Sequence, residues 1–272
     1  MARQRLGQHF LSDAGWREKI AREIGVSRNS SNFSAPGVEK EFCWIEIGAG
    51  HGEMTQHLAA TGKPVIAVEL DPPLARRLED LAAQFPNVTV HHNDVLKTDL
   101  RTLAAGRRVK IYGNLPYYIT SPILHHFFEF ADLIDEIYIV IQLEVAFRLV
   151  ARPGTRDYGY LSVLTQYFSR PAIALEIPRG AFRPPPEVGS ALVNLRLPGE
   201  KATSTIINEE KFLEFVKLCF AQKRKTLVNN LRSISEPEAT RAALAAIGIA
   251  PEARAEELSV AQLLVVFQEF QR

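Results

Sequence analysis

The stretch F-C-W-I-E-I-G-A-G-H-G, residues 42 to 52, decides the fold. Its first six residues are almost entirely apolar, which is typical of a strand buried on both faces. Gly48, Gly50 and Gly52 follow, and then a segment of helical period from Glu53 to Ala60. Glycines between a strand and a helix let the backbone approach a ligand closely. The stretch therefore predicts the start of a nucleoside-binding α/β sheet; a turn that merely needs glycines is the alternative.

The same alternation of strand and helix continues through the first 200 residues. Strands are expected at residues 64–70, 88–92, 109–112 and 136–141, and helices at 72–85 and 121–130. Such alternation predicts a parallel sheet covered on both faces. Two later apolar runs, 171–177 and 188–197, flank the proline-rich F-R-P-P-P-E-V-G and indicate a hairpin at the edge of the sheet.

The two ends of the chain differ from this pattern. Near the start, Ser12 is expected to cap an amphipathic helix that Gly25 ends, and Ser27 to Glu41 reads as a surface loop. After Pro198 and Gly199 all apolar periods are helical, at residues 208–221, 223–231, 235–247 and 259–270. Ser259 with Gln262 forms a capping box for the last helix. We therefore predict a domain boundary near residue 200, between an α/β domain over residues 1–199 and a helical domain over 200–272.

The composition is that of an ordinary globular protein. The chain has 272 residues, of which 46% are hydrophobic and 23% charged, and its net charge is +1, so any basic surface for nucleic acid must be local. We expect Cys43 and Cys219 to be reduced core residues. With no signal-peptide pattern and no membrane-length apolar run, we expect a cytoplasmic protein. We also expect it to act as a monomer, although no feature of the sequence decides the oligomeric state. The histidines lack the spacing of zinc ligands, and we expect no metal.

Two acids follow the next strands and define the expected cofactor site with Gly48 and Gly50. Glu69 ends the second strand, where an acid can bind the two hydroxyls of a ribose. Asp94 ends the third and is placed to accept a hydrogen bond from an adenine amino group, although such aspartates more often stabilise turns.

Both a nicotinamide cofactor and S-adenosyl-L-methionine fit these residues. The glycine spacing is G-x-G-x-G rather than the G-x-G-x-x-G that receives a pyrophosphate, and Glu53 enters the first turn of the following helix. A carboxylate there repels a pyrophosphate but tolerates a cationic sulfonium. The methyl donor is therefore favoured.

The loop Y-G-N-L-P-Y-Y-I-T-S-P, residues 112 to 122, carries the expected chemistry. The exocyclic amine of adenine is a poor nucleophile because its lone pair is delocalised into the ring. If the Asn114 side-chain oxygen and the Leu115 carbonyl each accept one N–H, the lone pair turns toward the methyl donor, and positioning supplies much of the rate. Pro116 would rigidify the loop and Tyr117 would stack on the base. Phe182 is a candidate for the other face of the base, with core packing as the more common outcome.

As a set, the motifs resemble those of ribosomal RNA small-subunit adenine N6,N6-dimethyltransferases of the KsgA type, almost from end to end. The motifs are G-Q-H-F-L at 7–11, E-I-G-A-G-H-G at 46–52, V-E-L-D at 68–71, N-D-V-L at 93–96, N-L-P-Y at 114–117, F-R-P-P-P-E-V-G-S-A at 182–191, K-R-K-T-L-V-N-N-L at 223–231 and G-I-A-P-E-A-R-A-E-E-L-S at 248–259. The resemblance implies an α/β class I methyltransferase with a Rossmann-like sheet and a small helical C-terminal domain. It also implies dimethylation of two adjacent adenosines near the 3′ end of small-subunit (16S) ribosomal RNA within the assembling 30S subunit.

The resemblance also assigns roles to single residues. His9 and Leu11 would line the methionine end of the cofactor, and Asn114 the edge of the active site. Gly48 would touch the cofactor, Glu69 hold its ribose and Asp94 its adenine. The chain departs from the family pattern where His9 replaces a frequent Asn, Ala49 a frequent Pro and Glu187 a usual Lys; the last puts one RNA contact in doubt.

A local cluster of positive charge is the expected RNA-binding surface. Residues 215–235 carry five basic side chains and no acidic one: Lys217, Lys223, Arg224, Lys225 and Arg232. Arg3 and Arg5, near the cofactor segment, would extend it. Such a surface binds phosphates without reading sequence. A solvated helix face is the alternative.

Three other functions compete with this hypothesis. A large-subunit methyltransferase of the macrolide-resistance type shares the fold. The segment 223–231 and Leu115 argue against this function. A non-catalytic assembly factor would not need the complete set of cofactor residues. A nicotinamide dehydrogenase would need the final glycine of its fingerprint and an evident acid–base residue.

Overall fold

The computed structural model describes residues 9–26, 41–203 and 208–271. Arg3, Arg5 and nearly all of the expected Ser27 to Glu41 loop lie outside these ranges. By its internal contacts the chain divides into two compact units. One comprises the residues up to Ala146 together with Ala172–Leu197, and the other comprises Phe147–Pro171 and Pro198–Arg272.

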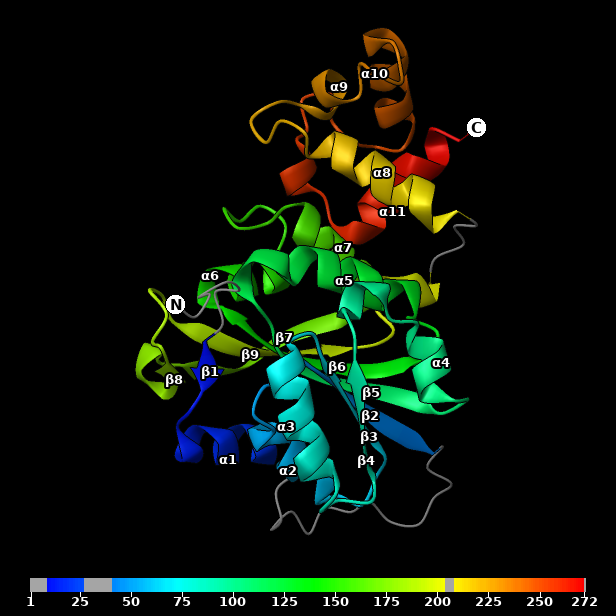
Figure 1. Ribbon diagram of the computed structural model, residues 1–272. Coiled ribbons are helices and arrows are strands. Elements are labelled where there is room, and N and C mark those ends of the chain that lie inside the picture. Colours follow the sequence, from blue (N-terminus) through cyan, green and yellow to red (C-terminus); the bar gives the residue numbers. More distant parts are fainter. Residues whose placement is uncertain (1–8, 27–40, 204–207, 272) are drawn as a thin grey trace. The chain divides into compact units, whose positions relative to one another are not determined.

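A seven-stranded sheet forms the centre of the first unit (Figure 1). The strands lie in the order β4 (Val88–His92), β3 (Val65–Glu69), β2 (Phe42–Ile47), β5 (Arg108–Asn114), β6 (Ile134–Gln142), β9 (Ser190–Arg196) and β7 (Arg170–Ile177). The first five are parallel to their neighbours, and β9 runs antiparallel to β6. The predicted parallel sheet is therefore confirmed, and β9 and β7 lie at one edge, as expected for the hairpin.

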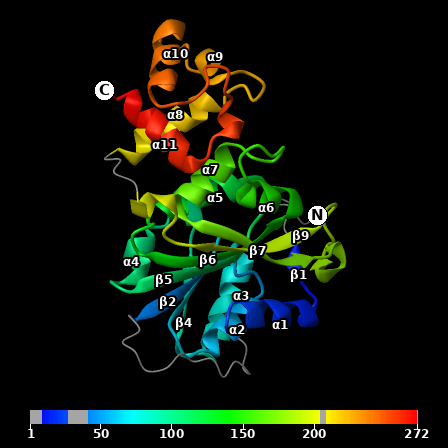
Figure 2. The same cartoon turned by 180° about the vertical axis from the view of Figure 1, so that it is seen from behind.

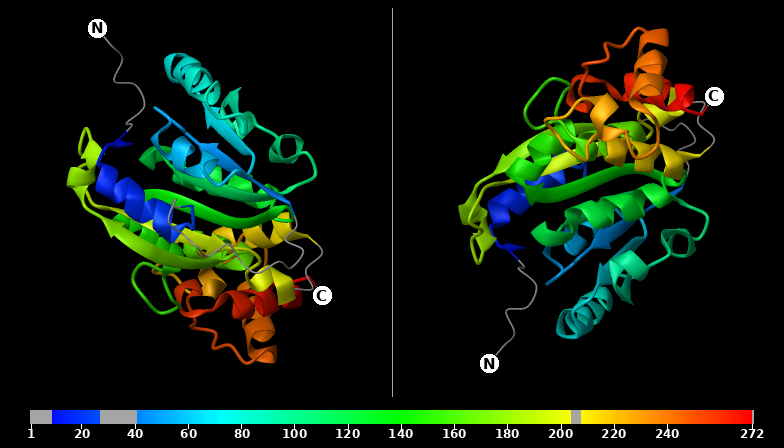
Figure 3. Two further views of the ribbon diagram at one scale, coloured as in Figure 1. Left: turned by 90° about the horizontal axis from the view of Figure 1, so that it is seen from below. Right: turned by 90° about the horizontal axis from the view of Figure 1, so that it is seen from above.

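Helices cover both faces of this sheet (Figures 1 and 3). On one face, α1 (Ala14–Glu23) and α2 (Glu53–Ala59) pack with Trp44 and Tyr112 in a single core cluster. On the other side lies α5 (Thr120–Glu129), while α3 (Pro72–Ala82) packs against β3 and β4, and the short α4 (Leu100–Ala104) precedes β5. The predicted cap of the first helix is wrong by one residue. Asp13 takes this role, because its Oδ1 accepts the Trp16 N–H at 3.0 Å.

The carboxyl ends of β2 and β5 lie close together. Ile47 pairs with Gly113, the residue before Asn114. A Cβ atom on Gly113 would lie 2.9 Å from Leu115 Cδ2 and 3.2 Å from Ile47 Cβ. Glycine therefore lets the loop after β5 turn directly beside the end of β2.

A second, two-stranded sheet holds residues 10 and 11 against residues 182 and 183. Strand β1 (Phe10–Leu11) pairs antiparallel with β8 (Phe182–Arg183), and Leu11 lies opposite Phe182. Figure 1 labels both strands, and Figure 2 shows β1 from behind. The Ser12 and Asp13 amides also donate to the Ala181 carbonyl, at 3.0 and 3.1 Å. These contacts fix His9 and Phe10 beside the glycine loop, residues 48–52. The resemblance placed His9 at the cofactor site, whereas the sequence did not indicate the pairing of β1 with β8.

The second unit is helical. It contains the second half of α6 (Leu143–Val150) and all of α7 (Tyr160–Phe168), α8 (Glu209–Cys219), α9 (Leu227–Asn230), α10 (Pro237–Ala246) and α11 (Val260–Glu269). The capping box of the last helix is confirmed: Ser259 Oγ accepts the Gln262 N–H at 3.2 Å, and Gln262 Oε1 accepts the Ser259 N–H at 2.9 Å. The break after Leu197 lies beside the expected boundary. The inclusion of Phe147–Pro171 in the helical unit was not foreseen.

The helix expected over 223–231 is shorter in the structure. Only Leu227–Asn230 is helical, because Thr226 caps the helix and Asn230 stabilises the preceding turn. Asn230 Nδ2 donates to the Cys219 carbonyl at 2.7 Å, and its Oδ1 accepts the Gln222 N–H at 3.2 Å. Residues 223–225 therefore lie in a turn between α8 and α9.

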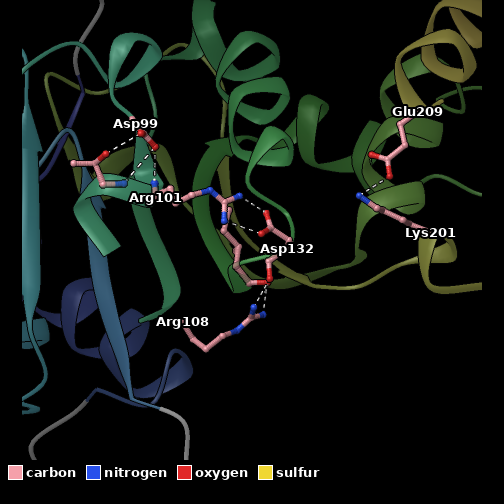
Figure 4. Close-up of polar contacts among 8 residues, drawn as sticks. Asp99, Arg101, Arg108, Asp132, Lys201 and Glu209 are labelled. Carbon is pink, nitrogen blue, oxygen red and sulfur yellow. Dashed lines mark hydrogen bonds and ion pairs between the residues drawn. The ribbon is translucent and has the colours of Figure 1, made fainter. Parts of the chain in front are cut away.

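Ion pairs at the surface connect neighbouring segments within each unit (Figure 4). Arg101 makes a bidentate pair with Asp132 at 2.8 and 2.9 Å. In the second unit, Lys201 Nζ lies 2.6 Å from Glu209 Oε1. The Arg101 and Asp132 side chains are 58% and 60% exposed, so we expect this pair to contribute little to stability. Across the described ranges, no helix is long and apolar enough to cross a membrane, and no cluster of metal-ligating side chains is found.

Candidate cofactor-binding and active site

The loop between β2 and α2 has a backbone that only glycine adopts readily. Gly50 and Gly52 have φ of +59° and +82°. A Cβ on Gly50 would lie 3.2 Å from Phe10 Cε1, and one on Gly52 would lie 2.9 Å from Leu81 Cδ1. Both positions therefore require glycine for conformation and for space.

Glu69 is the residue that holds this loop in place. Its side chain is buried, with Oε2 accepting the Gly50 N–H and Oε1 accepting the Asp71 N–H, both at 2.9 Å. An ionised carboxylate offers about four lone-pair sites, so each oxygen keeps capacity for a second donor. The same side chain that orders the glycine loop is thus able to accept the hydroxyls of a ribose.

Asp94 lies at the end of the adjacent strand, where it caps a short 3₁₀ turn, Val95–Lys97. Its Oδ1 accepts the Leu96 N–H at 3.0 Å, which is the turn role weighed from the sequence. The Asn93 N–H donates to the Glu69 carbonyl at 3.1 Å, so the ends of β3 and β4 meet. Contact of the other Asp94 oxygen with an adenine amino group stays a prediction.

Two apolar side chains beside these acids were missed from the sequence. Leu70 is 49% exposed and Leu96 37% exposed, although both are large and aliphatic. Leu70 directly follows Glu69, and Leu96 lies in the turn that Asp94 caps. Exposed aliphatic groups next to hydrogen-bonding acids suit a flat heteroaromatic ring. The only signal in the sequence was a leucine close behind each acid.

Asn114, at the end of β5, has a defined amide orientation. One side-chain atom lies 2.8 Å from the His9 carbonyl oxygen. Because a carbonyl only accepts, this atom must be the donor Nδ2. The Asn114 Oδ1 is therefore the acceptor that remains for a substrate amine.

Tyr117 begins a 3₁₀ turn, Tyr117–Ile119, and both its hydroxyl and its ring make contacts. Its hydroxyl lies 2.7 Å from Ser190 Oγ on β9, and its ring stacks on the His9 ring with centroids 5.3 Å apart and planes at 27°. Burial raises the pKa of the Tyr117 phenol, while the hydrogen bond with Ser190 acts in the opposite direction. The position of Ser190 as the partner of Tyr117 was not expected from the sequence.

Most of the predicted site residues line one small cavity of about 50 Å³. Its lining consists of His9, Phe10, Gly48, Gly50, Glu69, Asn114, Leu115, Pro116 and Tyr117. Asp94 and Leu11 are not part of this lining, and Leu11 is 7% exposed. Phe182 is completely buried in the core cluster, so core packing, rather than contact with a base, is what the structure shows for it.

A buried carboxyl group lies beneath the glycine loop. Glu46 on β2 pairs with Tyr112 on β5, and among the described residues neither Glu46 Oε2 nor the Tyr112 hydroxyl has a hydrogen-bond partner. Burial raises the pKa of Glu46 to about 8; the Thr55 hydroxyl acts in the opposite direction, and the Glu53 and Glu69 carboxylates raise the pKa further. Glu46 is therefore mostly protonated in the folded protein near neutral pH.

Replacement of Glu46 by Gln is expected to flatten the pH dependence of stability. A carboxyl whose pKa is raised by folding binds more protons in the folded state, so the wild type loses stability as the pH rises from about 4.5 to about 8. Glutamine cannot ionise and lacks this loss. Urea unfolding of both proteins across that range would measure the difference, and parallel curves would contradict it.

The predicted RNA-binding side chains of the second unit are exposed but not equally free. Arg224, Lys225 and Arg232 are exposed. Lys223 Nζ donates to the Arg156 carbonyl and lies 3.7 Å from Glu256 Oε2. Lys223 is thus engaged by contacts within its own unit, and contact of Arg224, Lys225 and Arg232 with phosphates stays a prediction.

The sheet, the glycine loop and the Asn114 loop together define a class I methyltransferase with a Rossmann-like sheet. A family model described as "Ribosomal RNA adenine dimethylase" matches residues 1–272. The chain belongs to the ribosomal RNA adenine dimethylase family, so the predicted family and the predicted enzyme class, an adenine dimethyltransferase, are both confirmed.

Individual relatives agree with this assignment. "Ribosomal RNA small subunit methyltransferase A" of Koribacter versatilis is 38% identical, covering 98% of this chain and 94% of the relative. The protein of the same name from Acidobacterium capsulatum is 41% identical over 97% and 89% of the two chains. Among solved structures, a dimethyladenosine transferase from Plasmodium falciparum has a TM-score of 0.78 at 22% identity, covering 97% of this chain and 98% of that one. The 23S rRNA methyltransferase ErmE has 0.67 at 26% identity, covering 97% and 100%.

Proposed function

We propose that the protein transfers methyl groups from S-adenosyl-L-methionine to N6 of two adjacent adenosines near the 3′ end of small-subunit (16S) ribosomal RNA. The proposed substrate is the assembling 30S subunit in the cytoplasm, and the enzyme acts as a monomer. The small-subunit target follows the names of the relatives that are 38% and 41% identical. The single observation that carries the chemistry is the orientation of Asn114, whose Oδ1 is left as an acceptor at the cavity that Gly48 and Glu69 also line.

The residues present fit the proposed cofactor. The glycine loop gives a backbone cradle that a Cβ on Gly50 would fill, and the Glu69 oxygens keep acceptor capacity for ribose hydroxyls. Leu70 and Leu96 offer apolar walls for the adenine, with Asp94 beside them. When bound, the cofactor supplies an electrophilic methyl group on a cationic sulfur.

The chain's own part in the reaction is to orient the amine. Asn114 Oδ1 and the Leu115 carbonyl would each accept one N–H of the target N6, so that its lone pair leaves the plane of the base. Tyr117, held by Ser190, would fix that plane by stacking. A strong general base is not required, because the amine loses a proton readily once methylated, and positioned acceptors supply rate through geometry.

The decisive experiment is methylation of purified small subunits that lack the modification, followed by primer extension across both ribosomal RNAs. Stops at two adjacent adenosines near the 3′ end of the small-subunit RNA are expected. Stops in large-subunit RNA would instead favour a 23S rRNA methyltransferase activity like that of ErmE, and a protein that binds small subunits but leaves both RNAs unmodified would be an assembly factor. Failure to bind S-adenosyl-L-methionine would reopen the dehydrogenase hypothesis.

Neutralising the basic turn is expected to weaken RNA binding in a salt-dependent way. The double substitution Arg224→Gln with Lys225→Gln removes two exposed charges, so the magnitude of the slope of log K against log salt should fall by about 1.4 to 1.8. Lys211→Gln on α8, also exposed, is the matched control. Filter binding to small subunits between low and moderate salt measures both slopes. Equal slopes for the double variant and the wild type would remove this turn from the RNA-binding surface.

A further inference from the structure

Tyr118 is an exposed aromatic residue in the loop after β5, and it directly follows Tyr117. It is 60% exposed. Among the Phe, Tyr and Trp residues that the structure describes, only Tyr118 and Phe147 are exposed, and all others are at least partly buried. Within the same ranges, the Tyr118 side chain has no hydrogen bond and no ring contact. Its ring is therefore available to a substrate.

Tyr117 and Tyr118 point in different directions, because both belong to one 3₁₀ turn, Tyr117–Ile119. Such a turn has three residues per turn, so successive side chains are about 120° apart. The Tyr117 ring stacks on His9, and its hydroxyl contacts Ser190. Tyr117 lines the small cavity of the site, whereas Tyr118 is not part of this lining. The Tyr118 ring thus lies beside the site and faces solvent.

The proposed reaction requires a place for the base next to the target adenine. The target base must leave its stack to bring N6 to Asn114 and Leu115, so the neighbouring base loses a stacking partner. The RNA chain nevertheless keeps this neighbour close. Successive stacked nucleotides are about 3.4 Å apart and consecutive Cα atoms about 3.8 Å apart, so neighbouring bases and neighbouring residues have similar spacing. The base next to the target is therefore expected beside the residue next to Tyr117.

We propose that Tyr118 stacks on the base next to the target adenine and replaces the stacking that this base has lost. The proposal rests on the proposed function. Aromatic side chains bind unpaired bases in this way without reading their identity, because every base has a π-face. The surrounding sequence suits RNA, since residues 112–128 contain no acidic side chain that would repel a phosphate. Tyr118 thus adds affinity for the opened substrate, while selection of the target amine stays with Asn114 and Leu115.

Removal of the Tyr118 ring is expected to weaken substrate binding without slowing the chemical step. Tyr118→Ala should raise KM for immature small subunits about five- to tenfold, the lower end of the range for base–aromatic stacking, because the ring stays partly in water. The change in kcat should be less than about twofold, since the stack is equally present in the ground state and the transition state. Tyr118→Phe keeps the ring and should match the wild type, whereas Tyr118→Leu is apolar but not flat and should resemble alanine.

Phe147→Ala is the matched control. Phe147 on α6 is 41% exposed and belongs to the second unit. Its replacement should leave KM unchanged. An equal rise in KM for Phe147→Ala and Tyr118→Ala would indicate a general loss of apolar surface and would overturn the assignment of Tyr118. Melting curves check that each variant is folded, and substitution of exposed side chains disturbs folding little.

Fluorescence tests the stack directly. In reconstituted small subunits, 2-aminopurine, whose emission is quenched by stacking, replaces one of the two adjacent adenosines while the other stays as the target. With saturating enzyme, emission should be higher with Tyr118→Ala than with wild type or Tyr118→Phe, for at least one of the two placements. Equal emission at both placements, or an unchanged KM for folded Tyr118→Ala, would overturn the role of Tyr118 alone, provided that the wild type methylates. Absence of methylation by the wild type would overturn the proposed function itself.

Discussion

Replacement of Asn114 by alanine is expected to lower kcat by at least about 100-fold, the loss seen when one preorganised polar group is removed from a reacting centre. Alanine cannot accept the substrate N–H, so the lone pair of the target amine stays delocalised in the ring. Cofactor affinity should change little, because Glu69 and the glycine loop are held by hydrogen bonds that do not involve Asn114. Single-turnover methylation of immature small subunits measures the rate, and calorimetry with the demethylated cofactor measures the affinity.

Asn114→Asp is the matched control for the second role of this side chain. Aspartate keeps an acceptor oxygen for the substrate amine but cannot donate to the His9 carbonyl. Any loss of activity that comes from the missing contact with His9 therefore appears in this variant as well. We expect Asp to retain more activity than Ala if acceptance of the amine is the main task. Full turnover by Asn114→Ala would contradict the mechanism, whereas equal inactivity of both variants would place the effect in the His9 contact.

The sheet was predictable because its signals are local. Each parallel strand is a continuous apolar run bounded by turn residues, and β2 and β4 were predicted with the bounds that the structure shows. The glycine loop, Glu69 and Asn114 follow from their places at strand ends, since the carboxyl ends of parallel strands meet at one edge. Local pattern and topology together were sufficient to predict most of the cavity lining.

The contacts that complete the site depend on residues far apart in the chain. Asn114 and His9 are 105 residues apart, and His9 and Pro184 are 175 apart. Strands β1 and β8 have two residues each, which is too short for a periodic pattern. Nothing in the local sequence distinguishes Ser190 as the partner of Tyr117, or Phe182 as a core residue rather than a base contact.

The helical unit shows a different limit. Helical period alone predicted one helix over residues 223–231, whereas in the structure the Asn230 side chain closes a turn before the helix, which begins only at Leu227. The segment Phe147–Pro171 belongs to this unit because α7 packs on α8 and α11, and such packing leaves no mark on the order of elements along the chain. The Asn230 turn is an example of a polar side chain whose hydrogen bonds to the backbone compete with a regular helix.

Glu69→Ala is expected to abolish cofactor binding and also to destabilise the first unit, which distinguishes it from a residue that only touches a ligand. The buried Glu69 carboxylate accepts the Gly50 and Asp71 amides, and its removal leaves these donors without their partner, at a cost of about 1–3 kcal/mol for each one that stays buried. The glycine loop would then lose the conformation on which the cradle depends. Urea unfolding without ligand and calorimetry with the demethylated cofactor measure the two effects separately.

Glu69→Gln tests whether the two effects have one origin. Glutamine keeps one acceptor oxygen, but its amide nitrogen would face the N–H of either Gly50 or Asp71, so one of the two loop contacts is lost while the side chain keeps its size. We expect a smaller loss of stability than for alanine and a cofactor affinity that falls in parallel. Loss of affinity with unchanged unfolding in both variants would mean that Glu69 serves only the ribose. Parallel losses would show that the carboxylate builds the site before any ligand arrives, because the backbone that receives the cofactor exists only while Glu69 holds it.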